Sequence, residues 1–257
     1  MSDLLVNVDN AVATLTLNRP EKRNAVTYDM WLAIAQHCAA FAADDSVRLL
    51  VVAGEGGHFC AGADVAGMAN VSAADYAGAN LAADVALTSF PKPSIAAISG
   101  SCVGGGAQIA TACDIRIADT TSRFGITPAR LGILYPAPAI ARTVGMIGPS
   151  ATKHLLYSAE IVDADRALRV GLVDELLAPA AAAERLEELS LLLASQRSLL
   201  TQMASKQMVD EAAEHGSISD ATVAYWDHAA ADSPDAREGI AAFIEKRPPR
   251  FTWTPNP

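Results

Sequence analysis

The sequence predicts an α/β fold followed by a helical C-terminal region. Two continuous apolar runs of strand length, "VRLLVVAG" at 47–54 and "SIAAISG" at 94–100, are typical of strands buried on both faces. Glycine-rich loops follow these runs, and apolar residues at helical spacing come after the loops, so strands and helices alternate along the chain. From about residue 149 onward the chain is rich in Ala and Leu, which indicates that mainly helices complete it.

The N-terminal segment predicts a hairpin followed by a helix. Alternating apolar residues in "LLVNVDNAVATLTL" at 4–17 indicate two short strands, with the turn at Asp9 and Asn10. Pro20 ends the second strand, and Thr27 is expected to cap the helix that follows. The apolar residues of this helix recur at helical spacing and are Met30, Ile34, Cys38 and Phe41.

The middle of the chain predicts further strand–helix units. A helix of small residues at about 73–89 is ended by two prolines, and the strand 94–100 leads into the glycines at 104–106. A helix is expected to start at these glycines. The next strand is then "DIRIAD" at 114–119.

The C-terminal part predicts mostly helices. One covers "AAAERLEELSLLLASQ" at 181–196, and the last is expected to start at Ser233, before a proline, and to stop at "KRPP" at 246–249. We therefore expect a ligand-binding core over residues 1–195 and a helical region over residues 196–257.

The composition argues against several classes of protein. The chain has 257 residues and 51 % apolar content, which suits a large buried core, and no apolar run approaches the roughly 18 residues of a membrane span. Its net charge of −10 and its scattered Lys and Arg argue against nucleic-acid binding. We expect no leader segment and a cytoplasmic location. The four cysteines lack C-x-x-C spacing, so we expect small buried thiols and predict no metal site.

The glycines at 104–106 predict an anion site at the start of a helix. Free N–H groups and the positive end of the helix dipole meet there, and residues without side chains let a ligand approach the backbone. Ile109 breaks the dinucleotide pattern G-x-G-x-x-G, and no phosphate loop is present, so a transient oxyanion remains. The alternative is that the glycines only allow close packing of helix on sheet.

A second small-residue loop favours the oxyanion. "HFCAGAD" at 58–64 also follows a predicted buried strand. Two such loops can each supply one N–H to the same oxygen, which is the usual geometry of an oxyanion hole.

Five motifs give the chain a resemblance to a known family. They are "NRPEKRNAV" at 18–26, "GHFCAGADVAGM" at 57–68, "GGGAQIATACDIRIA" at 104–118, "FGITPARLGI" at 124–133 and "GLVDEL" at 171–176. In order and spacing they resemble the crotonase superfamily, also called the enoyl-CoA hydratase/isomerase family, over about residues 4–250.

The resemblance implies a crotonase (ClpP-like) spiral of ββα units that acts on an acyl-CoA thioester. The thioester oxygen would lie between the N–H groups of Ala63 and Gly105, which stabilise an enolate. No cofactor is implied, because CoA is part of the substrate. The helical C-terminal region would form a homotrimer, or a hexamer of two trimers. The residues expected along CoA are Ala25, Ala61, Asp64, Val65 and Gly104.

The resemblance also implies that two catalytic glutamates are replaced. Family members that hydrate enoyl-CoA carry them at the positions of Gln108 and Pro128. Gln does not titrate and Pro has no side-chain proton, so efficient hydration is not expected. The polar catalytic candidates that remain near the thioester are Gln108, Thr127 and Tyr135. In a decarboxylase the Tyr135 phenol would be expected to hold the departing carboxylate or to relay a proton.

Two other functions stay open. "TPARLGILY" at 127–135 resembles methylmalonyl-CoA decarboxylases of the same superfamily, which share its Thr and its Tyr. Those enzymes differ in carrying a His where this chain has Ala63 and an acidic residue where it has Gln108. Decarboxylation of a malonyl-type thioester needs a stabilised enolate and no base to start it. The other alternative is a non-catalytic acyl-CoA-binding protein.

Three charged or titratable residues near these motifs have simpler interpretations. His58 is expected to be an exposed loop residue, and Arg130 a surface residue. Asp64 is expected to brace its loop by hydrogen bonds rather than to act as a base.

Overall fold

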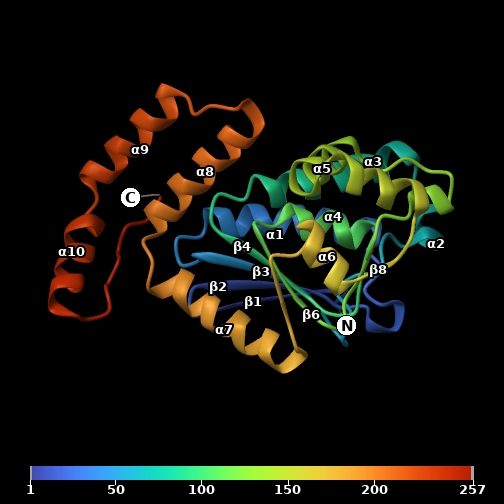
Figure 1. Ribbon diagram of the computed structural model, residues 1–257, viewed down its shortest axis with the longest axis horizontal. Coiled ribbons are helices and arrows are strands. Elements are labelled where there is room, and N and C mark those ends of the chain that lie inside the picture. The colour runs from blue at the N-terminus through green and yellow to red at the C-terminus, as the bar shows by residue number, and fades with distance from the viewer. Residues whose placement is uncertain (1, 256–257) are drawn as a thin grey trace.

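A computed structural model describes residues 2–255 and confirms the α/β class (Figure 1). Residue 1 and residues 256–257, the outermost positions of the predicted core and helical region, lie outside the described residues. The main sheet has the order β1-β2-β3-β4-β6-β9, in which only β1 and β2 are antiparallel. Its strands are β1 Leu4–Asp9, β2 Val12–Leu17, β3 Leu49–Gly54, β4 Ser94–Ile98, β6 Ile115–Asp119 and β9 Glu175–Leu177.

A second, three-stranded sheet has the order β5-β7-β8. Its strands are β5 Ser101–Val103, β7 Arg123–Gly125 and β8 Val162–Asp163. β5 is an addition to the sequence prediction, because it separates the strand 94–98 from the glycines at 104–106.

Helices cover both faces of the main sheet (Figure 1). α1, α3, α4 and α5 lie over one face and α7 over the other. The α-helices are α1 Tyr28–Ala43, α2 Val65–Met68, α3 Ala73–Thr88, α4 Gly105–Ala112, α5 Ala137–Ser158, α6 Ala164–Val170, α7 Pro179–Ser195, α8 Leu199–His215, α9 Asp220–Asp232 and α10 Asp235–Glu245. Two single turns, η1 Pro20–Lys22 and η2 Pro128–Arg130, are 3-10 helices.

The continuous apolar run of β3 is explained by the helices that cover both faces of this strand. Leu50 and Val52 belong to the core under α1 and α3, whereas Leu49 and Val51 pack with α7. Successive side chains of a strand point to opposite faces, so a strand covered on both sides has no polar alternation.

Two N-terminal details test the sequence prediction. Thr27 caps α1 as predicted, since its hydroxyl accepts from the N–H of Met30 at 3.2 Å. The predicted hairpin turn is wrong by one residue. Asp9 pairs with Val12, and the turn residues are Asn10 and Ala11, both with positive φ. A two-residue type I′ turn needs positive φ at both central positions.

α8, α9 and α10 extend away from the main sheet (Figure 1). α8 and α9 share a small core, formed by Leu199, Leu200, Met203 and Trp226. An ion pair at 2.9 Å between Lys206 of α8 and Asp114 joins them to the rest of the chain. None of the helices within residues 2–255 is long and apolar enough to cross a membrane.

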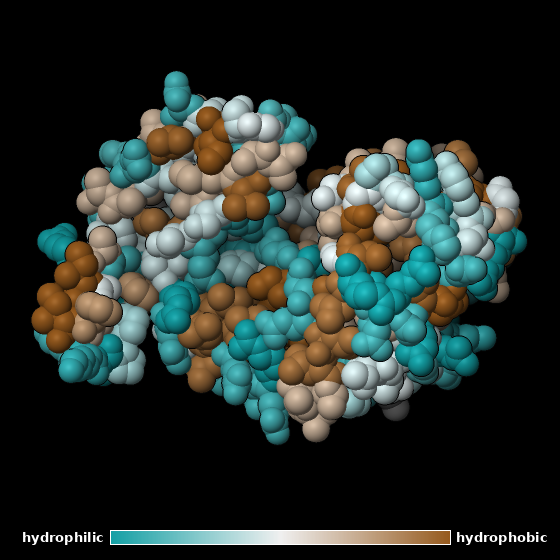
Figure 2. Space-filling view, viewed as in Figure 1, coloured by the Kyte–Doolittle hydropathy of each residue, from teal (hydrophilic) through white to brown (hydrophobic). Residues whose placement is uncertain are grey.

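The outer helix α10 exposes apolar side chains. Ile240, Phe243 and Ile244 are 63 %, 85 % and 72 % exposed. Figure 2 shows apolar surface at this edge of the molecule, at the left of the view. The polar side chains nearby are paired, since Arg247 binds Glu238 at 2.6 Å.

Candidate active site

The two small-residue loops run side by side. The N–H of Cys60 donates to the carbonyl of Ser101 at 2.7 Å, and the N–H of Val103 donates to the carbonyl of Cys60 at 2.9 Å. These bonds place the loop after β3 against β5, which leads directly into α4. The predicted juxtaposition of residues 58–64 and 104–106 is thus present in the structure.

Val26 fixes the direction of the backbone at Ala63. Its N–H donates to the carbonyl of Gly62, and its carbonyl accepts from the N–H of Asp64, both at 2.8 Å. Because adjacent peptide groups of an extended segment point in opposite directions, the N–H of Ala63 points away from Val26.

The N–H groups of Ala63 and Gly105 lie close together. A Cβ atom placed on Gly105 would be 3.4 Å from the amide nitrogen of Ala63, and one placed on Gly62 would be 3.8 Å from the amide nitrogen of Gly105. Neither N–H donates to another group within residues 2–255. As the first residue of α4, Gly105 has no acceptor within the helix. The N–H groups of Ala63 and Gly105 are therefore two neighbouring hydrogen-bond donors, and they lie at the positive end of the α4 dipole.

The glycines also serve the packing of α4 against the first loop. Gly104 has φ 54° and ψ −111°, a conformation that favours glycine, and its N–H donates to the carbonyl of Gly125 at 2.8 Å. A Cβ on Gly106 would overlap the carbonyl of Cys60 and lie 2.8 Å from the Cys60 Cβ. Close helix–loop packing, the alternative that the sequence left open, therefore accounts for Gly106.

Gln108 is buried in a network of polar side chains from α3 and α5. Its Nε2 donates to Oδ1 of Asn80 at 3.0 Å and to Oδ1 of Asp84 at 3.1 Å, and its Oε1 accepts from Nδ2 of Asn80 at 3.1 Å. Both amide hydrogens are thereby used within the chain. Only a lone pair of Oε1 is left for a ligand.

The Asp84 carboxylate behind Gln108 is held by Arg142. The guanidinium donates from Nη2 to Oδ1 at 2.7 Å and from Nη1 to Oδ2 at 3.2 Å, a bidentate pair. Arg142 also donates to the backbone carbonyl of Gln108 at 3.3 Å. The site thus contains a carboxylate that the sequence prediction missed, and its charge is balanced by Arg142.

Thr127 and Tyr135 both lie beside Gly104. The buried Tyr135 hydroxyl donates to the carbonyl of Gly104 at 3.1 Å, and burial raises the pKa of this phenol above its ordinary value. A Cβ on Gly104 would be 3.8 Å from Oγ1 of Thr127. Pro128, the first residue of η2, is buried next to Thr127. The hydroxyl of Tyr135 therefore supports the backbone that carries the second loop.

Asp64 braces the first loop, as predicted. It caps α2 by accepting from the N–H of Gly67 at 3.3 Å, and it forms an ion pair with Arg19 at 2.9 Å. Burial acts to raise the pKa of Asp64, but the hydrogen bonds from Arg19 and Gly67 outweigh it and hold the pKa below its ordinary value.

The remaining residues expected along CoA surround this loop. Arg19 also donates to the carbonyl of Ala25 at 2.7 Å, and the N–H of Ala61 donates to the carbonyl of Arg23 at 2.8 Å. Val65 is 53 % exposed at the start of α2, where a ligand can reach it.

His58, Arg130 and the cysteines complete the comparison with the sequence. The prediction of an exposed His58 is wrong, since its Nδ1 accepts from the N–H of Ser101 at 3.1 Å and its ring is only partly exposed. Arg130 is exposed, as predicted. All four cysteines are free and buried, as predicted, and burial raises the pKa of the Cys60 thiol to about 12.

Comparison with known proteins identifies the family of the chain. The model of the enoyl-CoA hydratase/isomerase family matches residues 7–254. The chain belongs to the enoyl-CoA hydratase/isomerase family.

Relatives of this family match the chain over nearly its whole length. A crotonyl-CoA hydratase of Syntrophomonas wolfei is 31 % identical over 97 % of both chains, and a 2,3-dehydroadipyl-CoA hydratase of Escherichia coli is 32 % identical over 98 % of this chain and 99 % of its own. A crystal structure of an enoyl-CoA hydratase/carnitine racemase from Magnetospirillum magneticum superposes with a TM-score of 0.91 at 29 % identity, covering 98 % of this chain and 96 % of the other.

The enoyl-CoA hydratase/isomerase fold brings together further polar residues that sequence reasoning missed. Tyr76, Asn80 and Asp84 occur every fourth residue on α3 and share one face of that helix. Tyr76 accepts a hydrogen bond at 2.9 Å from Nε1 of Trp31, which is on α1. The sequence signal that could have revealed these residues is their spacing, because polar residues at every fourth position form a stripe along a helix that otherwise consists mainly of small residues.

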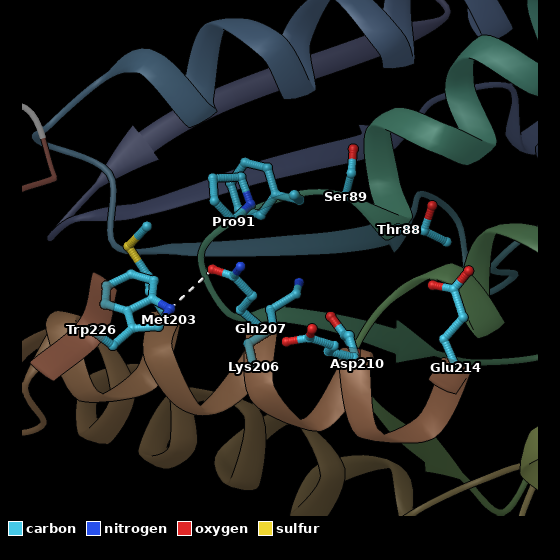
Figure 3. Close-up of a pocket in the computed structure, with 11 residues that line it drawn as sticks. Thr88, Ser89, Pro91, Met203, Lys206, Gln207, Asp210, Glu214 and Trp226 are labelled. Atoms are coloured by element: carbon cyan, nitrogen blue, oxygen red, sulfur yellow. Dashed lines mark hydrogen bonds between the residues drawn. The ribbon is translucent and has the colours of Figure 1, made fainter. Parts of the chain in front are cut away.

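A cleft of about 310 Å³ lies elsewhere, between the end of α3 and α8 (Figure 3). Thr88 and Ser89 border it on one side, and Lys206 and Asp210 on the other. It includes none of the predicted site residues, so it is separate from the candidate active site.

Proposed function

We propose that the protein binds an acyl-CoA thioester and stabilises an enolate at its carbonyl oxygen. The observation that carries this proposal is that the N–H groups of Ala63, in the first loop, and of Gly105, at the start of α4, lie close together and donate to no group within residues 2–255. Developing negative charge on the oxygen would gain from both donors, and one such donor typically contributes about 3 kcal/mol of transition-state stabilisation. The names of the relatives, hydratases of CoA thioesters, support the substrate class.

Efficient hydration is not the reaction that these side chains favour. Addition of water requires one group that takes a proton from water and one that gives a proton to carbon. Gln108 does not titrate and Pro128 carries no side-chain proton. Asp84 is the nearest carboxylate to Gln108 in the network, and it is bound by Arg142 on one side and by the Gln108 amide on the other.

Decarboxylation of a malonyl-type thioester is the second candidate reaction. The bond between the α-carbon and the carboxylate breaks, its electron pair forms the enolate, and CO₂ leaves. The charge-balanced network around Gln108 favours this candidate, because it presents no uncompensated negative charge to the carboxylate of the substrate.

One panel of assays separates these functions. Purified protein is given crotonyl-CoA, malonyl-CoA, methylmalonyl-CoA and ethylmalonyl-CoA, and hydration and CO₂ release are measured. We expect slow hydration and measurable decarboxylation. Rapid hydration of crotonyl-CoA would contradict the proposal that Gln108 and Pro128 cannot carry out the proton transfers of hydration. Binding of acetoacetyl-CoA without turnover of any of the four would identify a non-catalytic acyl-CoA-binding protein.

A backbone variant tests the donor pair itself. Gly105→Pro removes one N–H, and we expect it to abolish acetoacetyl-CoA binding in calorimetry. Gly78→Ala is the control, because a Cβ at this position of α3 meets open space. Unchanged binding in a folded Gly105→Pro variant would refute the oxyanion site.

We also propose that the protein self-associates, as a homotrimer or as a hexamer of two trimers. The exposed apolar side chains of α10 support this proposal, because a contiguous apolar face gains by being covered. Light scattering at micromolar concentration tests it, and a monomer would refute it.

A further inference from the structure

Tyr76 has a hydroxyl proton with no acceptor in the described chain. Its oxygen accepts from the indole N–H of Trp31 at 2.9 Å, and the phenol donates to no group within residues 2–255. A phenol can accept and donate at once, so this side chain has one hydrogen bond still to give. The residue is only partly buried.

The hydroxyl of Tyr76 belongs to the wall of the candidate site. Cζ2 of Trp31, two bonds from the indole nitrogen, lies 3.1 Å from the place where a Cβ on Gly105 would be. Asn80, one turn further along α3, holds the amide of Gln108. The charge of Asp64, next to Ala63, acts on the phenol as well. Tyr76 is thus linked through Trp31 to the loop at Gly105, and it lies within reach of the charge beside Ala63.

The other hydroxyls near the thioester position are less suited to give a proton. Tyr135 already donates to the carbonyl of Gly104 at 3.1 Å and is buried. Thr127 carries an aliphatic hydroxyl, which is a much weaker acid than a phenol. An enolate formed at Ala63 and Gly105 must still be protonated at its α-carbon before the product can leave.

We propose that Tyr76 delivers the proton to the α-carbon of the enolate. The inference rests on the proposed enolate chemistry. As the enolate collapses to the thioester, a C–H bond forms at the α-carbon and the O–H bond of Tyr76 breaks, leaving a phenolate that regains a proton from water. The same step completes decarboxylation, in which CO₂ has left, and hydration, in which hydroxide has added to the β-carbon.

Trp31 acts as a positioning residue for this step. Its N–H donates to the phenol oxygen, and this bond strengthens when the oxygen becomes negative, so it stabilises the phenolate. Burial raises the pKa of Tyr76 above its ordinary value despite this hydrogen bond. The phenol is therefore protonated at neutral pH and ready to act as a donor.

The test follows deuterium into the product. The four-thioester panel is turned over in ²H₂O, and the configuration at the α-carbon is determined for a product in which that carbon is a stereocentre, such as propionyl-CoA from methylmalonyl-CoA or 3-hydroxybutyryl-CoA from crotonyl-CoA. We expect wild type to place deuterium on one face. Tyr76→Phe keeps the ring and removes the hydroxyl, so kcat should fall at least about tenfold with little change in KM, and deuterium should appear on both faces.

Two further variants give the controls. Tyr157→Phe changes a tyrosine that is 74 % exposed on α5, and it should match wild type in rate and configuration. Trp31→Phe should lower kcat less than Tyr76→Phe does while partly scrambling the configuration, and circular dichroism verifies that each variant is folded.

Every outcome bears on the proposal. Deuterium on a single face in Tyr76→Phe, or a kcat equal to that of wild type, would overturn the role of Tyr76. Mixed configuration in wild type would overturn it as well. If wild type turns over none of the thioesters, proton delivery by Tyr76 is wrong along with the enolate chemistry, and calorimetry with acetoacetyl-CoA then shows separately whether thioester binding survives.

Discussion

The start of α4 and the outer face of α10 differ in the kind of group that they leave without a partner: backbone N–H donors at α4, and apolar side chains on α10. Around α4 polar side chains are paired within the chain, as in Gln108 with Asn80 and Asp84, whereas two backbone N–H groups donate to nothing among residues 2–255. On α10 the polar Arg247 and Glu238 are paired, whereas apolar side chains such as Phe243 stay exposed. Free N–H groups suit an oxygen atom of a ligand, and a free apolar face suits another protein surface.

The largest expected effect is at the buried ion pair that supports α4. Asp84→Ala leaves the Arg142 guanidinium and the amide of Gln108 without their carboxylate, so the free energy of unfolding should fall by about 3 kcal/mol. Urea denaturation measures it. Asp232→Ala on exposed α9 is the matched control, and an equal effect of both substitutions would contradict the importance of the buried pair.

A smaller loss is expected where α4 meets the first loop. Gly106→Ala places a methyl group against Cys60, and the shift that it forces should cost about 2 kcal/mol of stability and weaken acetoacetyl-CoA binding. Gly78→Ala in α3 meets no such contact and should stabilise the helix slightly. Thermal unfolding of both variants compares them, and a stability of Gly106→Ala equal to wild type would show that the loops are not packed this closely.

On α10 the expected effect is on association rather than on folding. Phe243→Glu puts a charge on the apolar face, so self-association should weaken at least tenfold, or about 1.4 kcal/mol, while the unfolding of the subunit changes little. Sedimentation velocity over a range of concentrations measures it. An oligomer as stable as that of wild type would place the interface elsewhere.

The smallest expected effect is at Tyr135. Tyr135→Phe removes the hydrogen bond to the carbonyl of Gly104 and keeps the ring, so stability should fall by about 1 kcal/mol. Turnover should change less than in Tyr76→Phe, because this hydroxyl is already occupied. A larger loss of turnover at Tyr135 than at Tyr76 would reverse the roles that we assign to the two phenols.

Local signals predicted where the two loops of the candidate site lie along the chain. The glycines at 104–106, the loop at 58–64 and the cap at Thr27 follow from rules that involve only a few neighbouring residues. The strands β5, β7, β8 and β9 were not predicted, because two or three residues are too few to show a periodicity.

The side-chain network was not predictable from such signals. Gln108 meets Asp84, which is 24 residues away, and Arg142, which is 34 residues away, through the packing of α3 and α5 on α4. No pattern within a short window indicates that these helices are neighbours. The sequence therefore led to the expectation that Gln108 stood without a carboxylate beside it, and only the fold reveals Asp84.

The hydrogen bonds of Val26 have a consequence for the speed of ligand capture. Because the carbonyl of Gly62 and the N–H of Asp64 are both held by Val26, we expect the N–H of Ala63 to keep the same direction when a thioester binds. Capture then requires no rearrangement of this loop, and stopped-flow traces should contain a single phase whose rate rises linearly with thioester concentration.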